Sequence, residues 1–218
     1  SEGERVLDGL SAQHFLSARV GFFEAYGTGD GIVFVQRKGC ECCGGGVHQV
    51  KIATPRQRRA NEYGERWALC DFVAPQGGGD YVGAFAVSVS PSLVDTARQL
   101  SEQGDDYEAL LLRSVCDRLV EAASEWLHEQ VRRSMWGYAP HEALSPKQMF
   151  AAAYEGIRPA VGYPSLPDQR AIFPIADMLD IGTIGIRLTE NGAMFPQASV
   201  CGLYIASREA RYFIVDNL

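Results

Sequence analysis

An unbroken amphipathic segment over residues 105–136 constrains the fold of this chain more than any other feature. Its apolar residues recur at the spacing of one helix face, which predicts a single long helix. The residues expected on the apolar face include Leu111, Val115, Leu119, Ala122, Trp126 and Leu127. The helix stands in the middle of the chain, so the elements on either side of it decide the fold class.

Strand patterns lie on both sides of this helix. Before it, alternating or apolar runs predict strands over residues 31–37, 47–52, 65–75 and 81–89. After it, similar runs predict strands over residues 184–190, 198–206 and 210–216. Strands at both ends with helices between them predict an α+β fold with an antiparallel sheet, in one domain over residues 1–218.

Shorter helices are predicted over residues 5–16, 90–104, 145–156 and 171–179. The second of these begins with Ser90 as its cap and has Pro91 in its first turn. The third begins with a capping box formed by Ser145 and Gln148, and it is predicted to end at Gly156.

A polar stripe follows the long helix opposite its apolar face. The stripe consists of Asp117, Glu121, Ser124 or Glu125, and His128. Their helical spacing places these residues on one face. Carboxylates so arranged can hold a cation, such as an ammonium or sulfonium centre, or a metal ion. The alternative is a solvated helix face, and only a second element facing the stripe distinguishes the two.

Three prolines stiffen the stretch over residues 157–168. Proline fixes its own φ and pushes the preceding residue toward extended geometry, so Arg158 and Tyr163 are held extended. Gly162 permits a close backbone approach or a positive φ. Such a segment can present free amides, including that of Ala160, to a flat polar ligand. The alternative is an ordered surface connection.

Three of the six cysteines cluster as Cys40, Cys42 and Cys43, with His48 shortly after them. Thiolate and imidazole groups bind Zn or Cu(I), but this spacing is not that of a zinc finger. A metal site, a redox-labile exposed loop and an incidental loop therefore remain open. The other cysteines lie in apolar runs and are interpreted as core residues: Cys70, Cys116 and Cys201.

Charge and hydropathy exclude two classes of partner. A net charge of −7 and a pI near 5.1 argue against general nucleic-acid binding. No apolar run reaches the roughly 18 residues that a membrane span requires.

The N-terminus lacks the apolar core of a signal peptide, so we expect a cytoplasmic chain with reduced thiols. No dinucleotide-binding, P-loop, nucleophile-elbow or zinc-protease motif is present.

Several stretches resemble the C-terminal activation domain of cobalamin-dependent methionine synthase. They are "CDFVAP", "DYVGAFAV", the long helix "DDYEALLLRSVCDRLVEAASEWLHEQVRRSMWGYAP", "GIRPAVGYPSLPD" and "LTENGAMFPQASVCGLYIASREARYFIV". The likeness runs from about residue 7 to residue 216. Its most specific parts are the R-P-x-x-G-Y-P motif and the late Met-x-Pro-x-Ala-Ser strand.

The resemblance implies a C-shaped α+β domain with a twisted antiparallel sheet flanked by helices, which binds S-adenosylmethionine (SAM). In this family the cobalamin of a partner domain is adventitiously oxidised to cob(II)alamin. A flavodoxin or flavoprotein reductase then supplies one electron, and SAM supplies the methyl group. The implied partners are these electron donors and the cobalamin-binding domain of methionine synthase or a related corrinoid protein.

The chain is expected to lack the N-terminal helical part and the C-terminal tail of the family domain, and to lack the cobalamin, folate and homocysteine modules. It is therefore expected to act as one component of a methyltransferase in methionine biosynthesis, without a complete active site of its own.

The resemblance also implies site residues in the proline-rich stretch. Arg158 would contact the SAM carboxylate through a charge-assisted pair. Ala160 would offer backbone hydrogen bonds to the adenine or ribose, and Gly162 and Tyr163 would complete this edge of the groove.

Other implied site residues lie outside that stretch. Glu121 on the long helix would attract the cationic end of SAM. Tyr212 and Phe213 match an aromatic pair that lines the site, and Asp117 matches an acid that faces the cobalamin side.

Two other functions remain open. One is a redox- or metal-sensing protein that uses Cys40, Cys42, Cys43 and His48. The other is a module that docks on a corrinoid protein without binding SAM.

Overall fold

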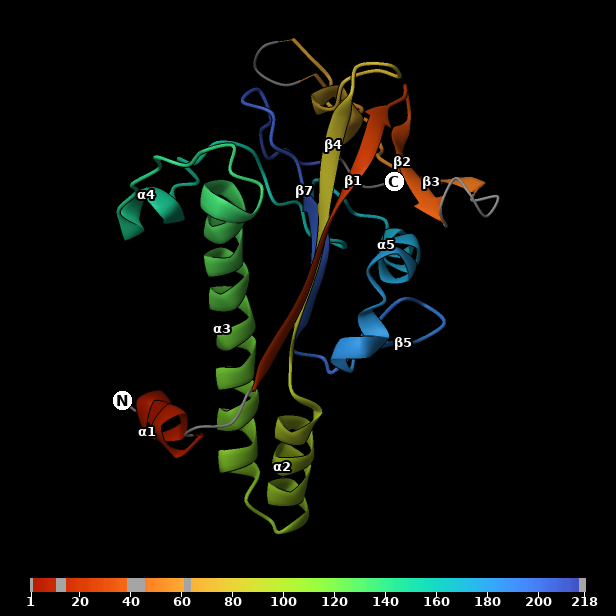
Figure 1. Cartoon of the computed structure of the whole chain (residues 1–218). Helices are drawn as coiled ribbons and strands as arrows, with labels where there is room; N and C mark the ends of the chain where they lie inside the picture. The colour runs from red at the N-terminus through yellow and green to blue at the C-terminus, as the bar shows by residue number, and fades with distance from the viewer. Residues whose placement is uncertain (1, 11–14, 39–45, 61–63, 216–218) are drawn as a thin grey trace.

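The computed structural model describes residues 2–10, 15–38, 46–60 and 64–215 (Figure 1). A five-stranded sheet in the order β3-β2-β1-β4-β7 runs through the middle of the molecule, and every neighbouring pair in it is antiparallel. Its strands are β1 (Leu16–Gly27), β2 (Gly31–Lys38), β3 (Gly46–Ala53), β4 (Asp80–Val89) and β7 (Ser199–Tyr204). The predicted α+β fold with an antiparallel sheet is confirmed.

Strand β1 was not predicted, although it pairs with both β2 and β4. Most of its residues are half-buried, so its side chains lack the clean alternation that marks a strand in sequence. The strand predicted over residues 65–75 is wrong. That stretch contains a short 3-10 helix, η2 (Leu69–Phe72), where the Asp71 carboxylate accepts a hydrogen bond from the Ala68 amide.

The helices are α1 (Glu2–Gly9), α2 (Pro91–Glu102), α3 (Asp106–Gln130), α4 (Pro146–Phe150) and α5 (Ile172–Leu179). Helix α3 continues into a π-helical turn, η3 (Val131–Met135). The predicted caps are confirmed at Ser90 and in the Ser145–Gln148 capping box. Helix α4 is shorter than predicted. It ends at Phe150, before Ala152 takes a positive φ, and Gly156 lies beyond it.

The end of the chain contains less strand than predicted. Residues 184–190 form only the two-residue strand β5 (Arg187–Leu188), which pairs with β6 (Met194–Phe195). The 3-10 helices η4 (Gln169–Ala171) and η5 (Ile181–Ile184) flank α5. Residues 210–215 form no strand, and this segment runs alongside the proline-rich stretch, where the Val215 amide donates to the Pro164 carbonyl at 2.9 Å.

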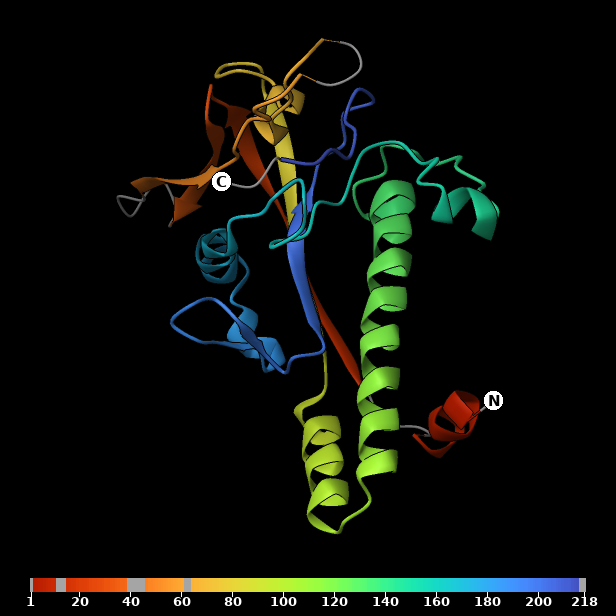
Figure 2. The same cartoon turned by 180° about the vertical axis from the view of Figure 1, so that it is seen from behind.

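Helices cover both faces of the sheet (Figures 1 and 2). Strand β4 shows why its sequence is so apolar: Phe85 and Val87 pack on the α3 side, while Ala84 and Ala86 pack on the α5 side. A strand buried on both faces has no polar face to show.

The apolar face predicted for α3 is only partly correct. Val115 and Leu127 are buried, but Ala122 is exposed and the Trp126 side chain is 61% exposed. Toward the C-terminal end of α3 the inward positions are held by Ser124 and His128, so polar residues replace part of the expected apolar stripe. None of the helices in the described part of the chain has both the length and the hydropathy of a membrane span.

Candidate functional site

The proline-rich stretch forms an irregular edge strand beside β7. Bridges join Ile157 to Ile205 and Ala160 to Gly202 in antiparallel orientation. The Pro159 carbonyl accepts the Leu203 amide at 3.0 Å. Proline is tolerated at such an edge because its missing amide breaks no ladder hydrogen bond.

Gly202 allows this close approach. A Cβ atom at that position would lie 2.4 Å from the Pro159 carbonyl oxygen and 2.8 Å from the Ala160 Cα. The hydrogen bonds to β7 come from the residues on either side of Ala160, so the amide and carbonyl of Ala160 itself point away from β7. The carbonyl accepts the Tyr163 amide at 3.2 Å.

An open cleft of about 790 Å³ lies between α3 and the proline-rich stretch. Its volume is in the range of small-molecule sites. Helix α3, the chain around Tyr154, the proline-rich stretch and the segment over residues 212–214 all contribute to its wall. Its polar and aromatic lining includes Arg118, Glu121, Ser124, Glu125, Phe150, Tyr154, Arg158, Tyr163, Ser165, Tyr212 and Phe213.

Arg158 is held at this cleft through both its backbone and its side chain. Its amide donates to the Tyr212 hydroxyl at 2.8 Å, and that hydroxyl lies 3.2 Å from the Tyr154 hydroxyl. Its guanidinium Nη2 lies 3.0 Å from the Glu125 Oε2, and the two side chains are 17% and 27% exposed. The guanidinium carbon also lies 5.8 Å from the centroid of the Phe85 ring.

The outer wall of the cleft carries a second ion pair. The Arg118 Nη1 lies 2.7 Å from the Glu121 Oε2, one turn before Glu125 on α3. Both side chains are exposed, so solvent screens this pair more strongly than the pair between Arg158 and Glu125.

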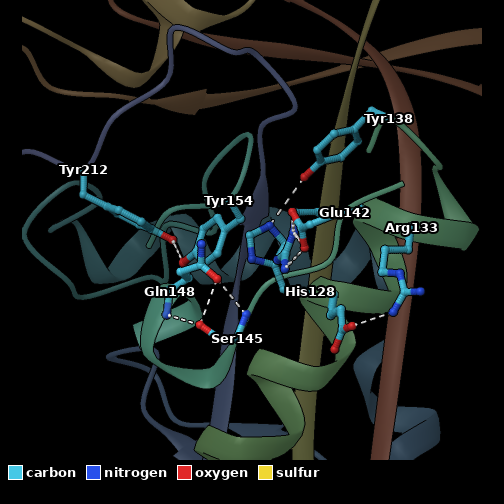
Figure 3. A network of polar contacts seen from close by, with 10 residues as sticks. His128, Arg133, Tyr138, Glu142, Ser145, Gln148, Tyr154 and Tyr212 are labelled. Carbon is cyan, nitrogen blue, oxygen red and sulfur yellow. Dashed lines mark hydrogen bonds and ion pairs between the residues drawn. The ribbon is translucent and has the colours of Figure 1, made fainter. Parts of the chain in front are cut away.

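Behind the cleft, His128 is fully buried among aromatic rings (Figure 3). Its ring stacks on Tyr204 with centroids 5.2 Å apart and meets Tyr154 edge-on at 4.8 Å. Burial, together with the positive charges of Arg132 and Arg158, holds the pKa of His128 well below its usual range. The imidazole is therefore neutral at physiological pH.

A buried ion pair between Arg132 and Glu142 lies beside the Tyr154 ring. The Arg132 guanidinium is fully buried and makes three contacts to Glu142. Its Nε lies 2.9 Å from both Oε1 and Oε2, and its Nη2 lies 2.6 Å from Oε1. Its carbon lies 4.4 Å from the centroid of the Tyr154 ring. Burial raises the pKa of Tyr154 above its usual range, and the neighbouring Tyr212 adds to this shift.

The segment that carries Tyr212 is tied to the proline-rich stretch. The Ser165 hydroxyl donates to the Phe213 carbonyl at 2.6 Å and lies 3.1 Å from the Phe213 amide, which donates back to it. The Phe213 ring packs against Trp67 and Phe72, with centroids 6.2 Å away in both cases. The two segments therefore form one wall of the cleft.

The model of the family described as "Vitamin B12 dependent methionine synthase, activation domain" matches residues 1–218. The chain belongs to this family. A solved structure described as "Crystal Structure of the MetH Reactivation Domain bound to AdoHcy" is similar to it, with 36% sequence identity and a TM-score of 0.87. The match covers 100% of this chain and 67% of that chain. The resemblance drawn from the sequence motifs is confirmed.

The fold brings most of the predicted site residues of this activation domain together. Six of them line the cleft: Glu121, Arg158, Ala160, Tyr163, Tyr212 and Phe213. Gly162 instead lies in a turn of the proline-rich stretch, with a φ of 83°. A Cβ atom there would lie 2.8 Å from the Gln169 Oε1. Asp117 lines an adjoining hollow of about 340 Å³, which shares Glu121 and Tyr163 with the cleft. The roles of these residues in ligand binding stay predictions.

The polar stripe on α3 does have an element facing it. Glu121, Ser124 and Glu125 line the cleft opposite the proline-rich stretch. Ser124 and His128 are buried, so the alternative of a solvated helix face is wrong for them. Sequence reasoning missed Tyr154 and Ser165. No local pattern distinguishes these two, because their partners Tyr212 and Phe213 are distant in sequence.

The cysteine cluster of Cys40, Cys42 and Cys43 lies outside the described residues, and His48 is exposed on β3. Among the residues that the structure describes, no group of three or more His, Cys, Asp or Glu side chains could hold a metal ion. The remaining cysteines, Cys70, Cys116 and Cys201, are buried free thiols as predicted. Burial raises the pKa of Cys201 to about 12.

Proposed function

We propose that this activation domain binds SAM in the cleft beside the proline-rich stretch and presents its methyl group to the cobalamin of a partner domain. One observation carries the proposal. Arg158, Glu121 and Ala160 line one cavity of ligand size. They bring to it a guanidinium, a carboxylate on a helix face, and a backbone amide that points away from β7.

Each group suits one part of SAM. The Arg158 guanidinium offers a charge-assisted hydrogen bond to the carboxylate of the amino-acid end. The amide of Ala160 is free to donate to the adenine or ribose, and the rings of Tyr163 and Tyr212 supply apolar surface for the adenine. The carboxylate of Glu121 stabilises the positive sulfonium centre by its charge.

The wall of the cleft is fixed before any ligand arrives. The proline-rich stretch is held by β7 on one side and by residues 212–215 on the other. A ligand that binds here therefore orders little of the backbone, which lowers the entropic cost of binding.

The cobalamin of the partner domain would accept the methyl group, with one electron supplied by a flavodoxin or a flavoprotein reductase. The adjoining hollow with Asp117 shares a wall with the cleft and is the surface that we assign to this partner. This chain contributes the binding and orientation of the methyl donor.

Isothermal titration calorimetry with SAM tests the proposal. The Arg158→Ala variant should lose about 2 kcal/mol of binding free energy, or roughly thirtyfold in affinity, because it removes a hydrogen bond to a charged group. Arg133→Ala is the matched control. Arg133 also forms an ion pair with a glutamate, Glu129, but neither residue lines the cleft. Equal affinities of wild type and Arg158→Ala would remove the central contact.

A pull-down with a purified cobalamin-binding domain tests the partner. We expect SAM to change the amount of domain retained. Capture that is strong but indifferent to SAM, together with no heat of SAM binding, would favour a docking module that uses no small ligand.

A further inference from the structure

We infer that Glu125 determines the specificity of the cleft. Its negative charge balances the positive charge of Arg158. The part of the cleft beside Arg158 therefore accepts a zwitterionic α-amino-acid group in preference to a plain carboxylate. The inference rests on the proposed function. It adds to that function a residue outside the ligand contacts that the family resemblance implies, and a selectivity that can be measured.

The first observation is the contact itself. The Arg158 Nη2 and the Glu125 Oε2 are 3.0 Å apart, both side chains are largely buried, and both line the cleft. Within residues 64–215, a single hydrogen bond joins the two side chains. In the described part of the chain, the Arg158 Nε and the Glu125 Oε1 are buried and have no hydrogen-bond partner. A guanidinium has five N–H donors and a carboxylate has several acceptor positions, so both groups keep bonding capacity.

The second observation is the charge balance around the pair. Among the residues that the structure describes, four charged side chains line the cleft, and they form two ion pairs: Arg118 with Glu121 and Arg158 with Glu125. Behind them Arg132 is paired with Glu142, and His128 is held neutral by its burial. No uncompensated positive charge therefore stands at the described wall of the cleft to attract an anion.

A ligand that brings only a carboxylate to Arg158 places its negative charge next to that of Glu125. In a partly buried site this repulsion is weakly screened. A ligand whose carboxylate carries an α-ammonium group brings its own positive charge for Glu125, so every charge keeps an opposite neighbour. The α-amino acid end of a sulfonium nucleoside has this arrangement.

A purely positional role for Glu125 predicts a different result. If Glu125 only held the guanidinium in place, its neutralisation would weaken every carboxylate ligand equally, with or without an α-ammonium group. The test therefore compares two ligands that differ in this one group. They are AdoHcy and its deaminated analogue, in which hydrogen replaces the α-amino group.

The variant is Glu125→Gln, which keeps the side-chain shape and can still accept the Arg158 hydrogen bond. The matched control is Glu129→Gln, one turn further along α3. Glu129 pairs with Arg133 at 2.8 Å, its side chain is 25% exposed, and it does not line the cleft.

Calorimetry should show that the wild type binds AdoHcy about tenfold or more tightly than the deaminated analogue, the effect of one hydrogen bond to a charged group. Glu125→Gln should bring the two affinities within about threefold of one another. Glu129→Gln should keep the wild-type ratio.

An unchanged ratio in Glu125→Gln, or an equal loss for both ligands, overturns the inference while the proposed function stands. A wild-type domain that binds neither SAM nor AdoHcy overturns the proposed function and the inference with it.

Discussion

The hydroxyl of Tyr212 lies 2.8 Å from the backbone nitrogen of Arg158 and accepts its hydrogen bond. The same hydroxyl lies 3.2 Å from that of Tyr154. Tyr212 was predicted as a residue that lines the site, and the structure adds that it braces the backbone of the arginine beside it. A ring that lines the cleft thus also fixes the segment that carries the guanidinium.

Tyr212→Phe should remove this brace while keeping the ring. We expect a loss of about 1 kcal/mol in the free energy of unfolding, the typical contribution of one hydrogen bond, measured by urea denaturation. Tyr26→Phe is the control, because the Tyr26 hydroxyl makes a long, exposed contact of 3.5 Å with Gln49. A Tyr212→Phe variant as stable as wild type would show that water replaces the phenol without cost.

Gly202→Ala should separate the proline-rich stretch from β7. The new Cβ atom would stand 2.4 Å from the Pro159 carbonyl oxygen, so the backbone has to move. We expect about 1–3 kcal/mol of destabilisation by thermal or chemical denaturation, as for other overpacked sites, together with weaker SAM binding. Gly182→Ala is the control, since no atom of the described residues lies within 4 Å of its Cβ position. Full SAM affinity in Gly202→Ala would contradict the assignment of this edge to the ligand.

Glu142→Ala should strongly lower the free energy of unfolding. It leaves the Arg132 guanidinium fully buried without its carboxylate, and breaking a buried ion pair costs about 3–5 kcal/mol. Glu129→Ala, which breaks the more exposed pair with Arg133, should cost less than about 1 kcal/mol. Unfolding curves of the two variants decide this, and similar losses would mean that Arg132 finds another partner.

His128 should make stability depend on pH below neutrality. Its pKa is lowered in the folded state by burial and by Arg132 and Arg158, so the unfolded chain binds the additional proton. Its contribution is fully present above about pH 6.5 and is lost as the pH falls below that value, with a slope of up to about 1.4 kcal/mol per pH unit.

Denaturation of His128→Gln across the range from about pH 7 to pH 5 measures this contribution. The variant should lack most of the slope that the wild type shows. His141→Gln, at an exposed position, is the control and should keep the wild-type slope. Identical slopes in all three proteins would place the acid sensitivity elsewhere.

Local physics explains what could be predicted. Some signals act over only a few residues and can therefore be predicted from the sequence. They are the capping side chains of Ser90 and Ser145, the apolar periodicity of α3 and the fixed φ of three prolines. The R-P-x-x-G-Y-P motif is likewise local, and it indicates the family from sequence alone. Strand β1 escaped prediction because its burial comes from partners on both sides, not from its own pattern.

The sequence by itself determined the long helix, the extended proline-rich stretch and the family. Only the tertiary structure decided which face of α3 turns inward, that Arg158 meets Glu125, and that Tyr212 holds the Arg158 amide. These contacts join residues 33 and 54 positions apart, and no local preference can encode them. They form because the sheet and α3, packed around a shared core, leave one place where an edge strand and a polar helix face can meet.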